Sequence, residues 1–150
     1  MQFTISLKNL LYIIAGIVSF SIIIFSLAKI LTPSVISMSY HINIIKETQE
    51  NTNFRRVVFT GPKSQLVVMS IPPGGEIGEE THKYTEQTLF FLSGRGEGML
   101  DDKKFPIGPG DAVVVTAGTK HNFRNTGTEP LKLYTVYAPP NHIDGRVHIT

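Results

Sequence analysis

Glycine and proline recur at short intervals through the second part of this chain, and this spacing constrains the fold more than any other feature. Twelve of the 13 glycines and eight of the nine prolines lie after residue 60. Between them stand short runs rich in Val, Leu, Phe and Tyr, and none carries a sustained helical period. Many short strands separated by frequent turns are typical of β-sandwiches and β-barrels. The sequence therefore predicts an all-β domain over residues 54–150.

The N-terminal part has a different composition. Between residues 1 and 45 the only charged side chains are Lys8 and Lys29, and residues 9–28 carry no charge. Twenty helical residues at about 1.5 Å each span roughly 30 Å, the thickness of a bilayer core. We therefore expect residues 1–31 to hold one transmembrane helix at about 10–31, and a single-pass membrane protein. A cleaved signal peptide and a buried core helix are the alternatives, but the run exceeds the usual apolar region of a signal peptide.

Residues 32–53 are predicted to form a linker, because they combine Pro33, several serines and the polar stretch KETQENTN. The predicted organisation is thus an N-terminal segment at 1–31, a linker at 32–53 and a β domain at 54–150. Lysines flank the apolar run on both sides, so the positive-inside rule does not indicate on which side of a membrane the domain would lie.

Charge and cysteine content exclude several classes of function. Residues 46–150 hold 12 basic and 12 acidic side chains, so the pI of about 8.9 comes from the two N-terminal lysines. A nucleic-acid-binding domain normally carries a clustered basic surface, so we expect no nucleic-acid partner. The chain has no cysteine. Disulfide scaffolds, zinc fingers, iron–sulfur sites and thiol nucleophiles are thereby excluded.

Candidate metal ligands stand in two separate parts of the β domain. Glu80 and His82 are two residues apart, so on a strand both would face the same side. His121 follows a later apolar run and a turn. A metal site needs side chains that converge from several strands, and imidazole, carboxylate and amide groups all serve as ligands. Taken alone, each histidine is more typical of a structural or surface residue.

The spacing of these residues resembles the two sequence motifs of the cupin superfamily. The first motif, G-x5-H-x-H-x(3,4)-E-x6-G, corresponds to Gly74-GEIGE-Glu80-Thr81-His82-KYTE-Gln87-TLFFLS-Gly94. The second, G-x5-P-x-G-x2-H-x3-N, corresponds to Gly110-DAVVV-Thr116-Ala117-Gly118-TK-His121-NFR-Asn125. The resemblance covers about residues 54–148 and is closest to small single-domain cupins, some described as mannose-6-phosphate-isomerase-like. It implies a double-stranded β-helix, the jelly-roll barrel of cupins.

Three positions depart from the motifs. Glu80 replaces the first metal histidine, Gln87 stands at the motif's glutamate, and Thr116 replaces the proline. Glu86 fits a shorter spacing to the glutamate position, but Gly94 then falls one residue late. The resemblance with these departures implies Glu80, His82, Gln87 and His121 as metal ligands, with Glu86 facing solvent. Such a mixed shell suits Fe²⁺, Mn²⁺, Ni²⁺ or Zn²⁺; the alternative is a degenerate barrel whose site is empty.

Three functions are compatible with this resemblance. The first is a metal-dependent enzyme, isomerase-like or dioxygenase-like, acting on a small molecule such as a sugar; no catalytic residue is assigned. The second is a non-catalytic module that binds or senses a small molecule at a membrane. The third is a structural role for homodimers, which small cupins form through sheet edges. The glycines of Gly94–Gly98 resemble a phosphate loop, but no helix follows, so we expect a hairpin turn there.

Overall fold

The computed structural model describes residues 7–8 and 39–149 of the 150-residue chain. Residues 1–38 and 39–150 form separate units. The described helix α2 (Ile44–Glu50) has seven residues, about 10 Å of length against roughly 30 Å of bilayer core. No described helix is long and apolar enough to cross a membrane. The prediction of a single-pass membrane location is therefore corrected, and the transmembrane helix expected at about 10–31 lies outside the described residues.

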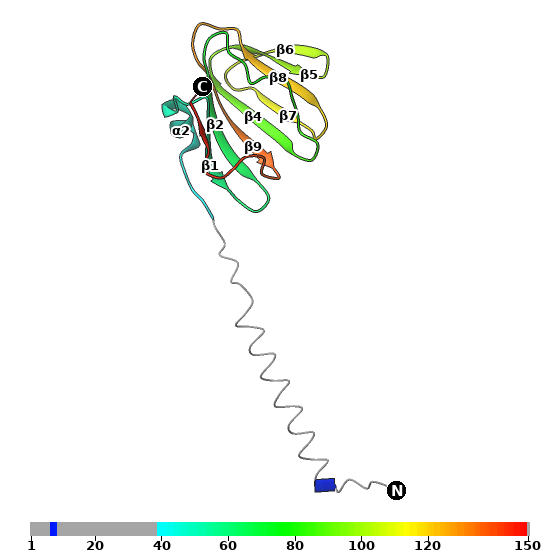
Figure 1. The fold of residues 1–150 in the computed structure, drawn as a ribbon. Coiled ribbons are helices and arrows are strands. Elements are labelled where there is room, and N and C mark those ends of the chain that lie inside the picture. Colours follow the sequence, from blue (N-terminus) through cyan, green and yellow to red (C-terminus); the bar gives the residue numbers. More distant parts are fainter. Residues whose placement is uncertain (1–6, 9–38, 150) are drawn as a thin grey trace. The chain divides into compact units, whose positions relative to one another are not determined.

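Two antiparallel sheets form a jelly-roll barrel, as the sequence predicted (Figure 1). One sheet has six strands in the order β10-β1-β2-β9-β4-β7, and the other has four in the order β3-β8-β5-β6. The strands are β1 (Arg55–Thr60), β2 (Gln65–Ile71), β3 (Glu80–Thr81), β4 (Glu86–Ser93), β5 (Gly96–Leu100), β6 (Lys103–Ile107), β7 (Ala112–Val115), β8 (Lys120–Asn125), β9 (Leu131–Ala138) and β10 (Val147–His148).

The core lies between the two sheets and follows the two-residue period of the strands. On β9, alternate side chains from Leu131 to Tyr137 are buried. They meet inward-facing residues of β2 and β4, such as Met69 and Leu89, and Phe123 of the opposite sheet. Near one end of this core the alternation brings Gln65, Tyr137 and Gln87 into a single row across three strands. This row places polar groups inside an otherwise apolar barrel.

Gly94 makes the connection between the two sheets. It follows β4 of the six-stranded sheet and precedes β5 of the four-stranded sheet. Its φ is +85°, and a Cβ there would lie 2.7 Å from Cα of Leu131. The prediction of a hairpin turn at Gly94–Gly98 is therefore wrong. Strands β4 and β5 do not pair, and the chain instead crosses from one sheet to the other.

Helix α2 falls inside the range predicted as a linker. Asn43 caps it by accepting a hydrogen bond from the amide of Lys46, and Glu47 pairs with Arg56 of β1. At its other end Nζ of Lys132 donates to the carbonyls of Gln49 and Asn51, at 2.9 and 2.6 Å. These contacts attach residues 44–51 to the barrel, although the domain boundaries themselves remain a prediction.

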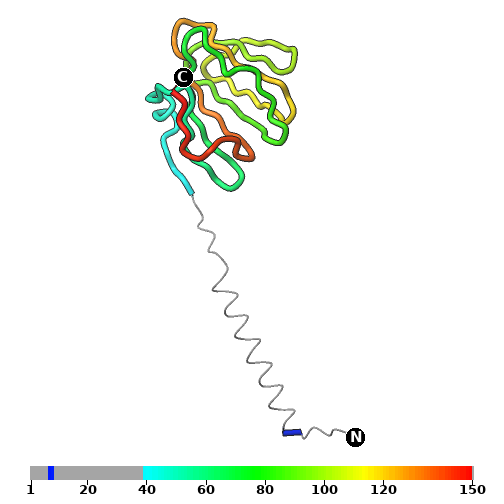
Figure 2. Tube along the Cα trace, viewed as in Figure 1, coloured from blue at the N-terminus to red at the C-terminus, as the bar shows by residue number. Residues whose placement is uncertain are grey.

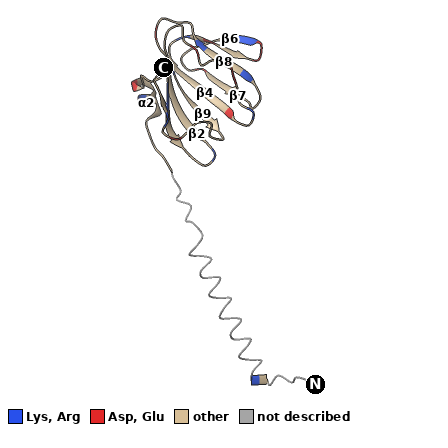
Figure 3. Ribbon diagram, viewed as in Figure 1, with Lys and Arg blue, Asp and Glu red and all other residues tan. Residues whose placement is uncertain are grey.

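The C-terminal segment returns across the barrel to pair with the first strand. Figure 2 shows this red segment following β1, where β10 adds an edge strand. Upstream of β10, the amide oxygen of Gln65 accepts hydrogen bonds from the backbone of Asn141 and His142, at 3.3 and 2.9 Å. Figure 3 shows residues of both charge signs on the strands of the barrel. The hydrogen bonds to Gln65 hold the C-terminal segment beside the polar row inside the barrel.

Candidate metal centre

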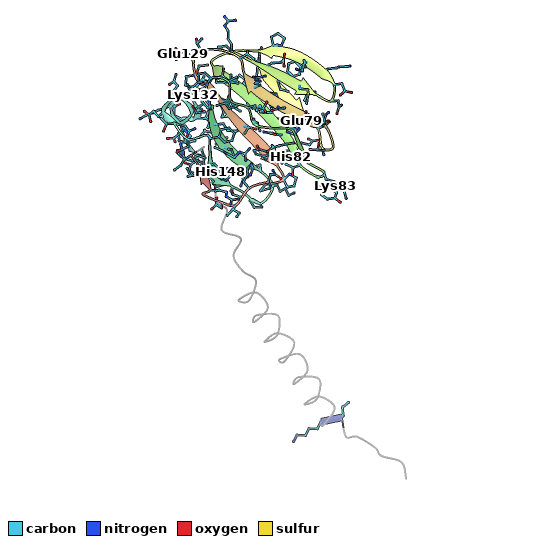
Figure 4. All side chains as sticks on the ribbon, turned by 45° about the horizontal axis from the view of Figure 1, so that its top comes forward. Glu79, His82, Lys83, Glu129, Lys132 and His148 are labelled. Carbon is cyan, nitrogen blue, oxygen red and sulfur yellow. The ribbon has the colours of Figure 1, made fainter. Side chains whose placement is uncertain are left out.

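Strands β3 and β8 bring the predicted ligands of the two motifs together. Their register pairs Glu80 directly with His121. His82 follows β3, and in Figure 4 it lies against the barrel while the neighbouring Lys83 extends away from it. The ligand-type atoms of Glu80, His82 and His121 all lie within 4.8 Å of one another. Residues about 40 positions apart in the sequence thus form one group of the size a metal ion requires.

Gln87 and Glu86 are placed differently on β4. Gln87 is 1% exposed, whereas Glu86 is exposed. Nε2 of Gln87 donates to the hydroxyl of Tyr137 at 2.9 Å, and this orients the amide oxygen away from that bond. The Gln87 side chain also lies close enough to His82 to affect the pKa of its imidazole. Gln87 is therefore positioned beside the group, and Glu86 is not.

The four predicted ligands share one feature that fits a cation. Each has a buried ligand-type atom without a hydrogen-bond partner: Oε2 of Glu80, Nε2 of His82, Oε1 of Gln87 and Nε2 of His121. Buried polar atoms are normally paired, and an orphaned one costs about 1–3 kcal/mol. The ligand-type atoms of Glu80, His82 and His121 lie within 4.8 Å of one another, and a bound cation would pair all of them. Two nitrogens and two oxygens match a divalent transition metal.

Neighbouring groups fix the orientation of the ligands. Nδ1 of His121 donates to the carbonyl of Thr119 at 2.9 Å, so the lone pair resides on Nε2, the buried and unpaired atom. Nη2 of Arg55 lies 3.5 Å from Oε1 of Glu80, which leaves Oε2 facing Nε2 of His82 at 3.4 Å. Such outer contacts hold metal ligands in position in characterised metalloproteins.

The electrostatics favour a neutral imidazole at His82. Burial lowers its pKa below the ordinary value, and the charges of His121 and Arg55 lower it further, while Glu80 acts in the opposite direction. Neutral imidazole is the form that ligates metals. Burial also raises the pKa of Tyr137, so its hydroxyl keeps its proton beside Gln87.

Comparison with known proteins decides the family. A family model described as a cupin domain matches residues 67–137. The crystal structure of the Bacillus halodurans protein BH2720 is 40% identical, with a TM-score of 0.74 over 76% of this chain and 91% of that one. The chain belongs to the cupin superfamily.

Two further proteins are similar to this cupin. The uncharacterized protein YrkC of Bacillus subtilis is 42% identical over 115 residues, which are 73% of this chain and 62% of that protein. The cupin thus spans less than two thirds of that relative's length. A crystal structure described as a predicted oxalate decarboxylase from Thermotoga maritima is 26% identical, with a TM-score of 0.50 over 53% of this chain and 69% of that one.

Three residues beside the ligands were not assigned from the sequence as part of a site. Arg55 is 8% exposed and faces inward with Val57; the two-residue period of β1 carried that signal, because a charged residue two positions from a core valine shares its side. Tyr137 lies outside both motifs, and its side chain on β9 is buried. His142 packs edge-on against Tyr137, with ring centroids 4.8 Å apart, and no motif indicated it.

One motif residue has a structural role. Asn125 ends the second cupin motif and is fully buried. Its Nδ2 donates to the carbonyls of Ile71 and Glu129, both at 2.8 Å, and its Oδ1 accepts from the amide of Gly127 at 2.9 Å. All its hydrogen-bonding groups are therefore engaged with backbone, and Asn125 joins the end of β8 to β2 and to the turn before β9.

Proposed function

We propose that this cupin binds one divalent transition metal ion through Glu80, His82, Gln87 and His121, and that a small molecule binds beside the metal. The observation that carries the proposal is the set of four buried ligand-type atoms without hydrogen-bond partners. Fe²⁺, Mn²⁺, Ni²⁺ and Zn²⁺ all suit two imidazoles and two oxygen ligands. Four protein ligands leave coordination positions free in a metal of higher coordination number.

The chemistry of such a site is that of a Lewis acid. A bound metal would polarise a carbonyl or carboxyl oxygen of the small molecule. The protein residues hold and orient: Thr119 fixes His121, Arg55 fixes Glu80, and Tyr137 fixes Gln87. Isomerase-like and dioxygenase-like reactions on a sugar-like or other small molecule both use this kind of site.

A non-catalytic binding module is the second candidate, and the proton inventory of the site favours it. Glu80 is committed to Arg55 and the metal, and Tyr137 keeps its proton because burial raises its pKa. Neither acidic group is thus free to act as a base. Among the described residues beside the ligands, the imidazole of His142 remains, and burial lowers its pKa to about 4, which makes it a weak base. Turnover of sugar phosphates, hydroxy acids and oxo acids by the metal-loaded chain distinguishes the two: conversion of any of them would exclude the non-catalytic candidate.

Metal content tests the proposed site directly. We expect the full chain, reconstituted in turn with Fe²⁺, Mn²⁺, Ni²⁺ and Zn²⁺ and then dialysed, to retain about one metal ion per chain. The double variant His82→Ala/His121→Ala should retain none, because two of four ligands are lost. His41→Ala is the matched control, since His41 is exposed. Elemental analysis that found equal metal in the double variant and the wild type would contradict the proposal.

We also propose that this cupin forms a homodimer through a sheet edge. Strand β7 is an edge of the six-stranded sheet. Val114 on this strand is 59% exposed, so the edge carries an apolar side chain that is open to solvent. Pairing of two β7 edges would satisfy those groups and cover the valine.

A further inference from the structure

Arg55 is a buried cation at the candidate metal centre. Its side chain is about nine-tenths buried, and its charge acts on the pKa of His82, Tyr137 and His142. Among these groups the guanidinium faces one carboxylate, that of Glu80, at 3.5 Å. A buried cation is expensive unless it is fully paired and hydrogen-bonded. The contact with Glu80 is long for a hydrogen bond, and the other contact of the guanidinium, with its Cζ 5.7 Å from the centroid of the Phe54 ring, is not a hydrogen bond.

One buried donor of the guanidinium has no partner. Nε of Arg55 is buried and has no hydrogen-bond partner. In the planar guanidinium fork the Nε–H bond and one N–H bond of Nη2 lie on the same edge. Nη2 lies 3.5 Å from Oε1 of Glu80, and Oε2 of the same carboxylate is also buried and unpaired. The unpaired Nε therefore belongs to a guanidinium that already contacts one of the proposed ligands.

The formal charges of these residues and of a bound metal do not cancel. The charges of Arg55 and Glu80 cancel, so a bound divalent metal would leave a formal excess of two positive charges. Gln87 stands where a second carboxylate would have reduced the excess. Such a buried positive centre is completed by an anion.

We infer that the small molecule of this cupin is a carboxylate, bound between the metal and the Arg55 edge. The inference rests on the proposed metal site. A carboxylate has two coplanar oxygens, one for the Nε–H of the guanidinium and one for the metal, and arginine pairs with this geometry better than lysine does. An uncharged sugar would leave the excess charge unbalanced. Inorganic phosphate also pairs with a guanidinium edge, but two of its four oxygens would then contact neither this edge nor the metal.

Calorimetric titration of the metal-loaded full chain tests the inference, with acetate, pyruvate, inorganic phosphate and glucose as probes in a chloride-free buffer. We expect acetate and pyruvate to bind more tightly than phosphate, and glucose not to bind. Arg55→Gln and Arg55→Lys should weaken carboxylate binding by about 10- to 100-fold, because each removes a charge-assisted hydrogen bond. Arg95→Gln is the matched control, since Arg95 is exposed in the turn between the sheets.

Metal content and circular dichroism of the same samples separate the possible failures. A wild-type chain without metal would overturn the proposed function, and the carboxylate inference with it. A wild type that holds metal but binds glucose or phosphate in preference to carboxylates would overturn the inference alone. So would Arg55 variants that fold, hold metal and bind acetate as the wild type does. Loss of metal from both Arg55 variants would also overturn it, because Arg55 would then act only through Glu80.

Discussion

His82 and His142 face the same buried region from two different segments, and both are held neutral by burial. For His82 this state is the one that a metal requires. For His142 the neutral state lowers the free energy of unfolding at low pH, because a histidine in the unfolded chain binds a proton more readily than the buried His142 does. The row formed by Gln65, Tyr137 and Gln87 fixes both neighbourhoods: Gln65 holds the backbone at His142, and Tyr137 holds Gln87.

We predict that the metal-free chain loses stability as pH falls from 7 to 5. A histidine whose folded pKa lies below its unfolded value of about 6.5 contributes stability that is present above pH 6.5 and is lost as pH falls toward the folded pKa. For His142 the folded pKa is about 4, so its contribution to stability decreases as pH falls from about 6.5 to 5. The free energy of unfolding in urea, measured at pH 7 and pH 5, should fall less in His142→Gln than in the wild type.

His41→Gln serves as the control for this measurement, because His41 is exposed. It should show the pH dependence of the wild type. An identical loss of stability in the wild type and in His142→Gln would show that His142 is protonated normally in the folded chain.

At the scale of elements, the strands that carry the proposed metal site differ from the edge strand β7, which pairs with a neighbouring strand on one side only. Strands β3 and β8 carry Glu80 and His121, two members of the group that could hold a metal ion, and β4 carries Gln87, the further ligand that we propose. Strand β7 pairs with β4 on one side only. Its outward-facing Val114 is exposed, while Val113 and Val115 are buried in the core. The same strand therefore closes the core with one face and presents an open edge.

We predict that the full chain is a dimer and that Val114→Lys makes it a monomer. A lysine on an edge strand opposes edge-to-edge pairing through its charge and hydration. Light scattering should give a mass of twice 16.6 kDa for the wild type and about 16.6 kDa for the variant. Tyr84→Lys is the control, since Tyr84 is 73% exposed in the loop after β3. A monomeric wild type, or a dimeric Val114→Lys variant, would refute pairing through β7.

The local pattern predicted strands but neither the helix nor how the strands connect. The short apolar runs each became strands, because alternation and turn residues are local signals. The role of Gly94 was not predictable, since a sheet crossing and a hairpin turn both use glycine. Helix α2 was missed because seven residues do not form a stable helix alone; its contacts with Arg56 and Lys132 come from distant strands.

At the scale of the whole molecule, the two motifs predicted which residues converge, and the fold supplies the reason. A jelly roll places β3, β4 and β8 around one interior, so spacing within each motif was sufficient to place Glu80, His82 and His121 together. Arg55 lies outside both motifs. Its inward orientation depends on the register of β1 against β2, which pairs Arg55 with Met69, and register is a tertiary property.

The central claim is that Glu80, His82, Gln87 and His121 share one metal ion. Anomalous diffraction from crystals of the metal-loaded full chain, recorded on both sides of the absorption edge of the metal, measures this directly. The account predicts one edge-dependent peak within about 2.0–2.3 Å of Oε2 of Glu80, Nε2 of His82, Oε1 of Gln87 and Nε2 of His121. A barrel without a peak between these atoms, or a metal bound only elsewhere on the chain, would contradict it.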